Sequence, residues 1–478
     1  MINNIRLLIN RAFLVLFSVS LLISCAVNPV TGRKELMLIS ERQEIELGKS
    51  SAPSLKWEFG GKYHDPELTS YLGKIVDQLW QNSERPHLPV QFYIQNTSVP
   101  NAFALPGYVA ITRGLLSEME NEAQFAAVMG HEVGHVMARH SAQRISRMQL
   151  QQIGLAVGSA ALEGTKGADT LLKVGAVGSS LLLLRYDRSQ EIQSDRLGAQ
   201  YMADLGYDPR EALSAHKVLE RSVDNYLKRL GKTRGGDSLI SNLLSTHPRT
   251  SVRLDEIQSM INELPPYRTN GDGKFSERFQ KATNKMRATN KVYHIYDKAE
   301  ALYNEKKFKE AEKELKEAIA RDSKQAAFHN LLGFIKLQQK EYEEASRLYG
   351  KALSIDPDYH PSIYGTGLVE FLQERYKPAI LRFEKSLELF PGHASSHFAL
   401  GKSHFMLKQY SDAIPYLKNF AGAAPKHPEI HGLLGISYDN RKELKPAATE
   451  YINQLQVAPD TDLGRHAKKR LQELGVIQ

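Results

Sequence analysis

The chain has 478 residues, of which 42% are hydrophobic and 24% charged, so it is long enough for two or three folded domains. Its net charge of +8 comes from Lys and Arg residues interleaved with Asp and Glu, a pattern that indicates solvated helix faces and argues against nucleic acid as a partner. The single cysteine, Cys25, excludes an intramolecular disulfide and a zinc site built on cysteine pairs.

The N-terminus has the pattern of a secretory signal. Arg6 and Arg11 precede an apolar run at residues 12–23, which is about half the length needed to span a bilayer. The sequence Leu-Ile-Ser-Cys at residues 22–25 resembles a bacterial lipoprotein box. We therefore expect a signal peptide at 1–24, lipidation of Cys25 and, because Ala26 follows it, an outer-membrane protein facing the periplasm. The alternative is a signal anchor with an incidental cysteine.

The next segments alternate between extended and helical patterns. Residues 26–60 are expected to be extended, and residues 66–83 carry apolar positions at helical spacing. Two strand-like runs, 89–94 and 108–112, flank turn-forming residues at 101–107, and residues 114–262 are expected to be almost wholly helical.

A possible metal site lies in this helical part. His131, Glu132 and His135 form an HExxH sequence, which on a helix places the two imidazoles roughly 40° apart on one face, where both can bind one zinc ion. Asn121 and Gln124 are typical of a capping box that opens this helix. Three polar side chains would then face the interior, and a metal would compensate their burial. The alternative is a core of ordinary hydrogen-bonded histidines.

A third ligand must come from elsewhere in the chain. On a continuous helix His140 would lie about 140° around from His135 and would point away from it. Glu191 is a better candidate, because Asp195 shares its helix face and could hold a ligand histidine by the second ring nitrogen. An isolated E-x-x-x-D sequence is also typical of a solvated helix face.

Residues 153–184 are rich in Gly, Ala and Leu, but charged residues interrupt every run before it could span a membrane. We expect a buried helix pair, and a mobile lid or a hairpin that touches the membrane is the alternative.

The residue composition changes near residue 263, where Pro265 and Pro266 end a helical pattern and turn-forming residues follow. We therefore place a linker at 263–290. Beyond it, glycine, alanine and proline positions recur every 34 residues, as in Gly333, Gly367, Gly401 and Gly435. This period resembles tetratricopeptide repeats. The sequence thus predicts a helical solenoid over 291–478, with repeats near 292–325, 326–359, 360–393, 394–427 and 428–461 and a capping helix at 462–478.

Several motifs together resemble one family. They are the HExxH sequence at 131–135, Glu191-x-x-x-Asp195, Ser-Thr-His-Pro at 245–248, Asn-Ala-Phe-Ala at 101–104 and Gly-Leu-Leu at 114–116. The combination is similar to the gluzincin-type zinc peptidases grouped with HtpX and the CAAX prenyl proteases, and most of all to the repeat-containing subgroup of beta-barrel assembly-enhancing proteases. The resemblance covers about residues 26–262 and 292–478. It implies a mainly α fold, in which a helical peptidase domain with a small β-sheet precedes the solenoid.

The resemblance also implies roles for particular residues. One zinc ion per chain would be held by His131, His135 and Glu191, with Glu132 as general base. His247 is the candidate for stabilising the oxyanion, with Arg253 second; His247 could instead occupy the fourth zinc position, or be a structural histidine before Pro248. The run Tyr108, Val109, Ala110 and Ile111, ending at Thr112, would be an edge strand that pairs with an extended substrate, unless it is an ordinary sheet strand.

Two functions fit these patterns. The first is an envelope endopeptidase that cleaves misfolded or stalled periplasmic and outer-membrane proteins, with substrates or the β-barrel assembly machinery docking on the repeats. The second is a periplasmic chaperone or scaffold with a regulatory or latent zinc site. The complete HExxH sequence favours the enzyme, because a scaffold has no need of Glu132.

Overall fold

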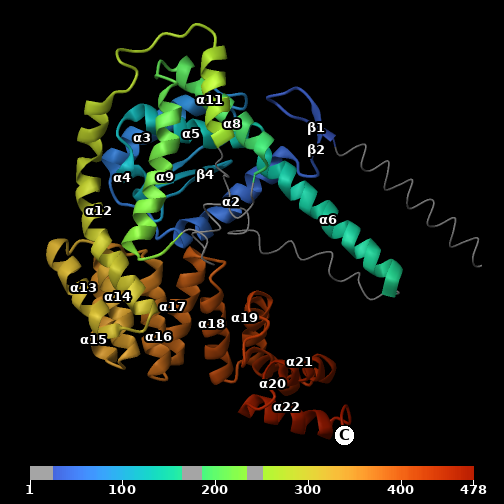
Figure 1. Ribbon diagram of the computed structural model, residues 1–478. Helices are drawn as coiled ribbons and strands as arrows, with labels where there is room; N and C mark the ends of the chain where they lie inside the picture. The colour runs from blue at the N-terminus through green and yellow to red at the C-terminus, as the bar shows by residue number, and fades with distance from the viewer. Residues whose placement is uncertain (1–24, 164–185, 234–250) are drawn as a thin grey trace, which may run out of the picture. The chain divides into compact units, whose positions relative to one another are not determined.

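The computed structural model describes residues 25–163, 186–233 and 251–478, and the chain divides into two compact units, Met1–His294 and Ile295–Gln478 (Figure 1). Both units are mainly helical, and the sheets lie only in the first, so the predicted fold class is confirmed. Within the described ranges, no helix combines the length and the apolar character needed to cross a membrane.

The first unit contains a β-hairpin, a three-stranded sheet and a surrounding set of helices. The hairpin consists of β1 (Cys25–Val27) and β2 (Lys34–Leu36), and the sheet of β3 (Phe92–Gln95), β4 (Ala102–Leu105) and β5 (Tyr108–Thr112). The helices are α2 (Glu41–Glu58), α3 (Pro66–Gln81), α4 (Arg113–Glu118), α5 (Glu122–Met137), α6 (His140–Glu163), α8 (Arg188–Asp204), α9 (Glu211–Arg229) and α11 (Ser251–Glu263).

Two elements differ from the expectations. Much of the 26–60 segment, expected to be extended, is helix α2, which begins at a capping box between Ser40 and Gln43. The turn expected at 101–107 is confined to its last residues, Pro106 and Gly107, where Gly107 has φ 85°. The residues before them form β4, whose short Ala-Phe-Ala-Leu sequence lies buried against helix α5 and lacks a clear alternating pattern.

The sheet has the order β3-β5-β4, so Tyr108–Thr112 is its central strand and the expected edge strand is a wrong prediction. β5 pairs in parallel with β3 and antiparallel with β4, and both of its edges are therefore occupied. This position explains its uninterrupted burial, because a strand in the middle of a covered sheet has no solvated face. Within the described residues, β4 pairs with β5 alone and is the edge strand beside α5.

Helices α5 and α8 pack at unusually close range because glycines line their contact, which we call the glycine seam (Gly130, Gly134 and Gly198). A Cβ atom on Gly198 would lie 2.9 Å from the backbone nitrogen of His131, and one on Gly134 would lie 3.2 Å from Ser194. Real Cβ atoms essentially never approach as closely as the one on Gly198 would, and a Cβ atom on Gly134 would force its neighbours to shift by a few tenths of an ångström. The seam brings residues 191–195 of α8 next to residues 131–135 of α5.

The expected linker at 263–290 is only partly a linker. Residues 265–275 are irregular, but α12 (Ser276–Asn304) begins within the proposed segment. Phe279 and Met286 of this helix are fully buried in the core of the first unit, and the division into compact units falls between His294 and Ile295. The turn residues at 270–273 lie within this irregular stretch, but they gave no sign that the following helix belongs to the first core.

The second unit is a series of helix pairs. After the end of α12 come α13 (Phe308–Arg321), α14 (Ala326–Gln338), α15 (Tyr342–Ile355), α16 (His360–Leu372), α17 (Tyr376–Leu389), α18 (Ala394–Met406), α19 (Tyr410–Ala423), α20 (Ile430–Asn440), α21 (Leu444–Val457) and α22 (Asp462–Glu473). Successive helices contact one another, as each pair of a solenoid must to bury its apolar face.

Small and large residues interlock between the two helices of each pair. Hypothetical Cβ atoms on Gly333, Gly367 and Gly435 would lie 2.5–2.7 Å from the rings of Tyr349, Phe383 and Tyr451. Those three rings are fully buried. The 34-residue spacing of these glycines therefore reflects close helix packing.

Candidate metal centre

Helix α5 places its two histidines one turn apart, as the HExxH sequence predicts. The Asn121 side chain caps the helix by accepting a hydrogen bond from the Gln124 backbone at 2.8 Å. The Nε2 atoms of His131 and His135 then lie 3.0 Å apart. His135 is 1% exposed and His131 12% exposed, so the pair lies at the inner end of an accessible site.

Helix α8 brings Glu191 to the same point. The helix starts at a capping box between Asp187 and Gln190, which puts Glu191 in its first turn. The Glu191 carboxylate is 1% exposed, and its oxygens lie 3.4 Å from Nε2 of His135 and 3.7 Å from Nε2 of His131. These three side chains form a group of possible metal ligands whose donor atoms all lie within 4.8 Å of one another.

The donor set fits zinc. Zinc takes nitrogen and carboxylate ligands at about 2.0–2.2 Å in tetrahedral geometry, so two ligand atoms should be roughly 3.3 Å apart. The three observed separations, 3.0, 3.4 and 3.7 Å, surround this value. Two imidazoles and one carboxylate are also the ligands of a class of catalytic zinc sites, in which the fourth position stays open.

Asp195 contacts the His131 ring as predicted, and Arg253 contacts Asp195 in turn. The Nδ1 atom of His131 lies 2.7 Å from Oδ1 of Asp195. Arg253 donates to both oxygens of Asp195, at 2.5 and 2.8 Å, and also pairs with Glu191. Burial raises the pKa of Asp195, but the Arg253 hydrogen bond and the neighbouring positive charge outweigh it and hold that pKa well below its usual range. Arg253 thus neutralises two buried carboxylates.

His140 lies against His135, contrary to the expectation that it points away. That expectation assumed one continuous helix, whereas α5 ends at Met137 and α6 starts a new direction at His140. The Nδ1 atoms of the two rings are 2.8 Å apart, and Nε2 of His140 lies 3.0 Å from Oε1 of Gln193. Burial lowers the pKa of His140 to about 4, so its ring is neutral at pH 7.

Glu132 is almost buried, with 6% exposure, and it lines a pocket next to His131. The apolar part of the lining includes Ala127, Val128, Leu219 and Ile257. His216 also lines this pocket, 3.5 Å from Asp195. No sequence motif marked His216, since it lies alone on α9 and approaches the site only through the fold.

Some predicted features lie outside the described residues. They are the signal peptide at 1–24, residues 164–184 of the 153–184 segment and the motif at 245–248 with His247. The described structure therefore brings together His131, Glu132, His135, Glu191 and Asp195. It places Arg253, the second candidate for the oxyanion, on Asp195 and Glu191, and it adds His140 and His216 to the site.

These features define a class of protein: a helix-borne HExxH metallopeptidase domain followed by a solenoid of helix pairs. Residues 66–261 match peptidase family M48, and residues 302–366, 364–428 and 398–462 match tetratricopeptide repeats. The chain therefore contains a peptidase family M48 domain followed by tetratricopeptide repeats, as the sequence motifs predicted.

Curated relatives are similar to up to about half of this chain. The chain is 27% identical to the beta-barrel assembly-enhancing protease of Yersinia pestis, over 50% of this chain and 48% of that protein. It is 27% identical to the mitochondrial metalloendopeptidase OMA1 of Schizosaccharomyces pombe, over 51% and 68% respectively, and 34% identical to OMA1 of Arabidopsis thaliana, over 37% and 33%. The matched part thus spans about half the length of the Yersinia relative.

Proposed function

We propose that this chain is a zinc-dependent endopeptidase of the bacterial envelope. The observation that carries the proposal is the convergence of His131, His135 and Glu191 on one point beside the buried carboxylate of Glu132. A structural metal site needs ligands alone, whereas an acid or base next to an accessible pocket serves chemistry.

The side chains of the site have two roles: some hold the metal, and Glu132 transfers a proton. When bound, zinc would polarise the scissile carbonyl and lower the pKa of a water molecule. Glu132 accepts a proton at its carboxylate and returns it to the leaving amine. Asp195 holds the His131 ring by Nδ1, which leaves Nε2 free of a proton for metal binding, and Arg253 fixes the position of Asp195.

We assign substrate pairing to β4 instead of β5. The backbone carbonyl of Asn101 accepts a hydrogen bond from the backbone N–H of Thr112. Along an antiparallel pair of strands, residues whose backbone groups point toward the partner strand alternate with residues whose groups point away from it. The backbone groups of Ala102 and Ala104 therefore point away from β5. Asn101 and Ala102 line the pocket that contains Glu132, so a substrate strand added here would pass the site.

The remaining parts of the proposal come from sequence patterns and relatives. His247 would stabilise the oxyanion or occupy the fourth metal position. Lipidated Cys25 would anchor the protein at the periplasmic face of the outer membrane. The repeats would dock misfolded envelope proteins or the β-barrel assembly machinery, since one relative is named for enhancing barrel assembly and repeats of this kind bind proteins.

The decisive experiment separates metal binding from proteolysis. Glu132→Gln should bind one zinc per chain, as the wild type does, while its rate of cleaving unfolded casein falls by about 10²–10⁴-fold, because the proton acceptor is gone. Chelation should abolish wild-type cleavage. Glu67→Gln, an exposed glutamate on α3, is the control and should keep full activity.

Cleavage by Glu132→Gln at the wild-type rate would contradict the proposal. A wild-type protein that binds zinc but cleaves neither casein nor an unfolded outer-membrane protein would favour the second candidate, a chaperone or scaffold with a regulatory metal.

A further inference from the structure

The corner between α5 and α6 depends on one residue in an unusual conformation. Arg139 has φ 58°, a left-handed backbone that is unfavourable for a residue with a side chain. Its side chain compensates for this strain: Nε donates to Glu44 and Nη2 to the Ile39 carbonyl, both at 2.8 Å. Arg139 and Glu44 are each 6% exposed, so this ion pair is buried.

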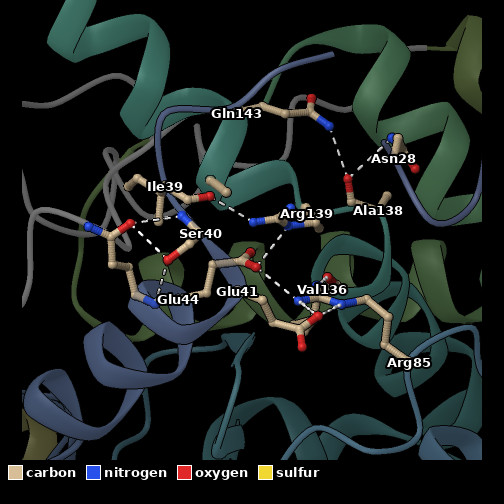
Figure 2. Close-up of polar contacts among 12 residues, drawn as sticks. Asn28, Ile39, Ser40, Glu41, Glu44, Arg85, Val136, Ala138, Arg139 and Gln143 are labelled. Atoms are coloured by element: carbon tan, nitrogen blue, oxygen red, sulfur yellow. Dashed lines mark hydrogen bonds and ion pairs between the residues drawn. The ribbon is translucent and has the colours of Figure 1, made fainter. Parts of the chain in front are cut away.

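Further hydrogen bonds fix the C-terminal end of α5, as Figure 2 shows. The Val136 carbonyl accepts from Arg85 at 2.8 Å, and Arg85 also donates to Glu44 at 2.9 Å. The Ala138 carbonyl accepts from Gln143 at 2.9 Å and from Asn28 at 3.3 Å. The Val136 and Ala138 carbonyls are therefore satisfied by side chains from the segment between α3 and β3, from α6 and from the N-terminal segment, while Glu44 of α2 binds both arginines.

This fixed corner turns His140 back onto His135, and the two contacts of His140 define which atoms carry protons. A histidine nitrogen that binds a metal has no proton, so neutral His135 carries its proton on Nδ1 and donates it to Nδ1 of His140. His140 must then carry its own proton on Nε2, where Oε1 of Gln193 accepts it at 3.0 Å. Ser194 lies 3.4 Å from the accepting nitrogen, farther than His135.

We propose that His140 is a positioning residue that holds His135 in the ring orientation and tautomer needed for metal binding, through the chain His135–His140–Gln193. The inference rests on the proposed metal centre. It gives the two histidine ligands different partners, because His131 has the charged Asp195 and His135 has a neutral imidazole. A neutral acceptor adds no further negative charge to a site that already holds Glu132, Glu191 and Asp195.

The test is zinc affinity, measured by competition with a chromophoric chelator. His140→Phe keeps a ring but removes the acceptor, and it should weaken zinc binding by about 10–100-fold, the usual effect of losing such a partner. His140→Asn offers Oδ1 near the position of Nδ1 and should recover most of that loss. Gln193→Leu should give an intermediate loss, and His404→Phe, in the repeats, should bind zinc as the wild type does.

Metal-free melting temperatures provide a readout of folding that is independent of zinc affinity. Wild-type affinity in His140→Phe would overturn the inference, as would equal losses in His140→Phe and His140→Asn. If the wild type itself bound no zinc, the proposed function would fail first, so the two failures are distinguishable.

Discussion

The two units of this chain hold their helices together in different ways. In the first unit, buried charged side chains join segments far apart in sequence, as Arg253 joins Asp195 and Arg139 joins Glu44. In the repeats, helices adjacent in sequence interlock through a small residue and a large one, as Gly435 does with Tyr451. Removing one partner of a buried ion pair leaves a buried charge unpaired and is costly, whereas the repeats distribute their stability over many similar contacts.

This contrast can be measured one unit at a time. Both tryptophans of the chain, Trp57 and Trp80, are buried in the first unit. Tryptophan fluorescence therefore follows unfolding of the first unit alone, whereas circular dichroism follows the helices of both. Three tests of the contrast follow, in order of expected effect.

The largest effect is expected from Arg253→Met. The change leaves Asp195 and Glu191 as buried carboxylates without their cation, and breaking such a pair costs about 3–5 kcal/mol. In metal-free protein the fluorescence transition should move to much lower urea. Arg196→Met is the control, since Arg196 forms an exposed pair with Glu263 that should contribute less than about 1 kcal/mol. Equal shifts in the two variants would contradict the contrast.

A smaller change in stability is expected when glycines in the repeats are replaced by alanine, and its sign depends on the position. Gly435→Ala places a Cβ atom 2.5 Å from the buried Tyr451 ring, and such overpacking costs about 1–3 kcal/mol. Gly350→Ala meets no atom within 4 Å on an exposed helix face and should stabilise by about 0.5–1 kcal/mol. Both should move the circular dichroism transition and leave fluorescence unchanged. If both alanine variants were less stable than the wild type, the close packing of Gly435 against Tyr451 would not be the reason for the loss of stability.

The smallest effect concerns pH. Burial lowers the pKa of His393 to about 4 in the folded repeats, below its value of about 6.5 in an unfolded chain. Between these two pH values the unfolded state therefore binds more protons than the folded state. The contribution of neutral, buried His393 to the free energy of unfolding is complete above pH 6.5 and is lost as the pH falls toward 4. Between pH 7 and 5, His393→Asn should lose less stability than the wild type, by on the order of 1 kcal/mol. An identical pH dependence would exclude His393 as the source.

The repeats could be predicted from sequence because their contacts are local. One period of 34 residues specifies which positions meet, and the structure places Gly333, Gly367 and Gly435 against rings 16 residues later. The metal ligands could also be proposed, because i and i+4 positions on α5 and α8 fix which side chains share a face.

The rest of the site depends on backbone geometry that no periodic pattern encodes. The sequence misplaces His140 because α5 ends at Met137 and the left-handed Arg139 turns the chain before α6 begins. The turn formers at 101–107 conceal the short strand β4, and the family resemblance made β5 the expected edge strand, whereas β5 lies between β3 and β4. Arg253 and His216 reach Asp195 across 58 and 21 positions of sequence, and only the tertiary fold brings them there.

The glycine seam has a consequence for how this centre can change. A side chain on Gly198 would press against the backbone of His131, and one on Gly134 against Ser194, so a larger residue at either point would shift a helix that carries a ligand. Variation that tunes substrate preference must therefore accumulate in the pocket wall supplied by α9 and α11, where Leu219 and Ile257 lie. In this chain the glycine seam beneath the metal ligands tolerates little substitution, whereas the pocket walls can vary.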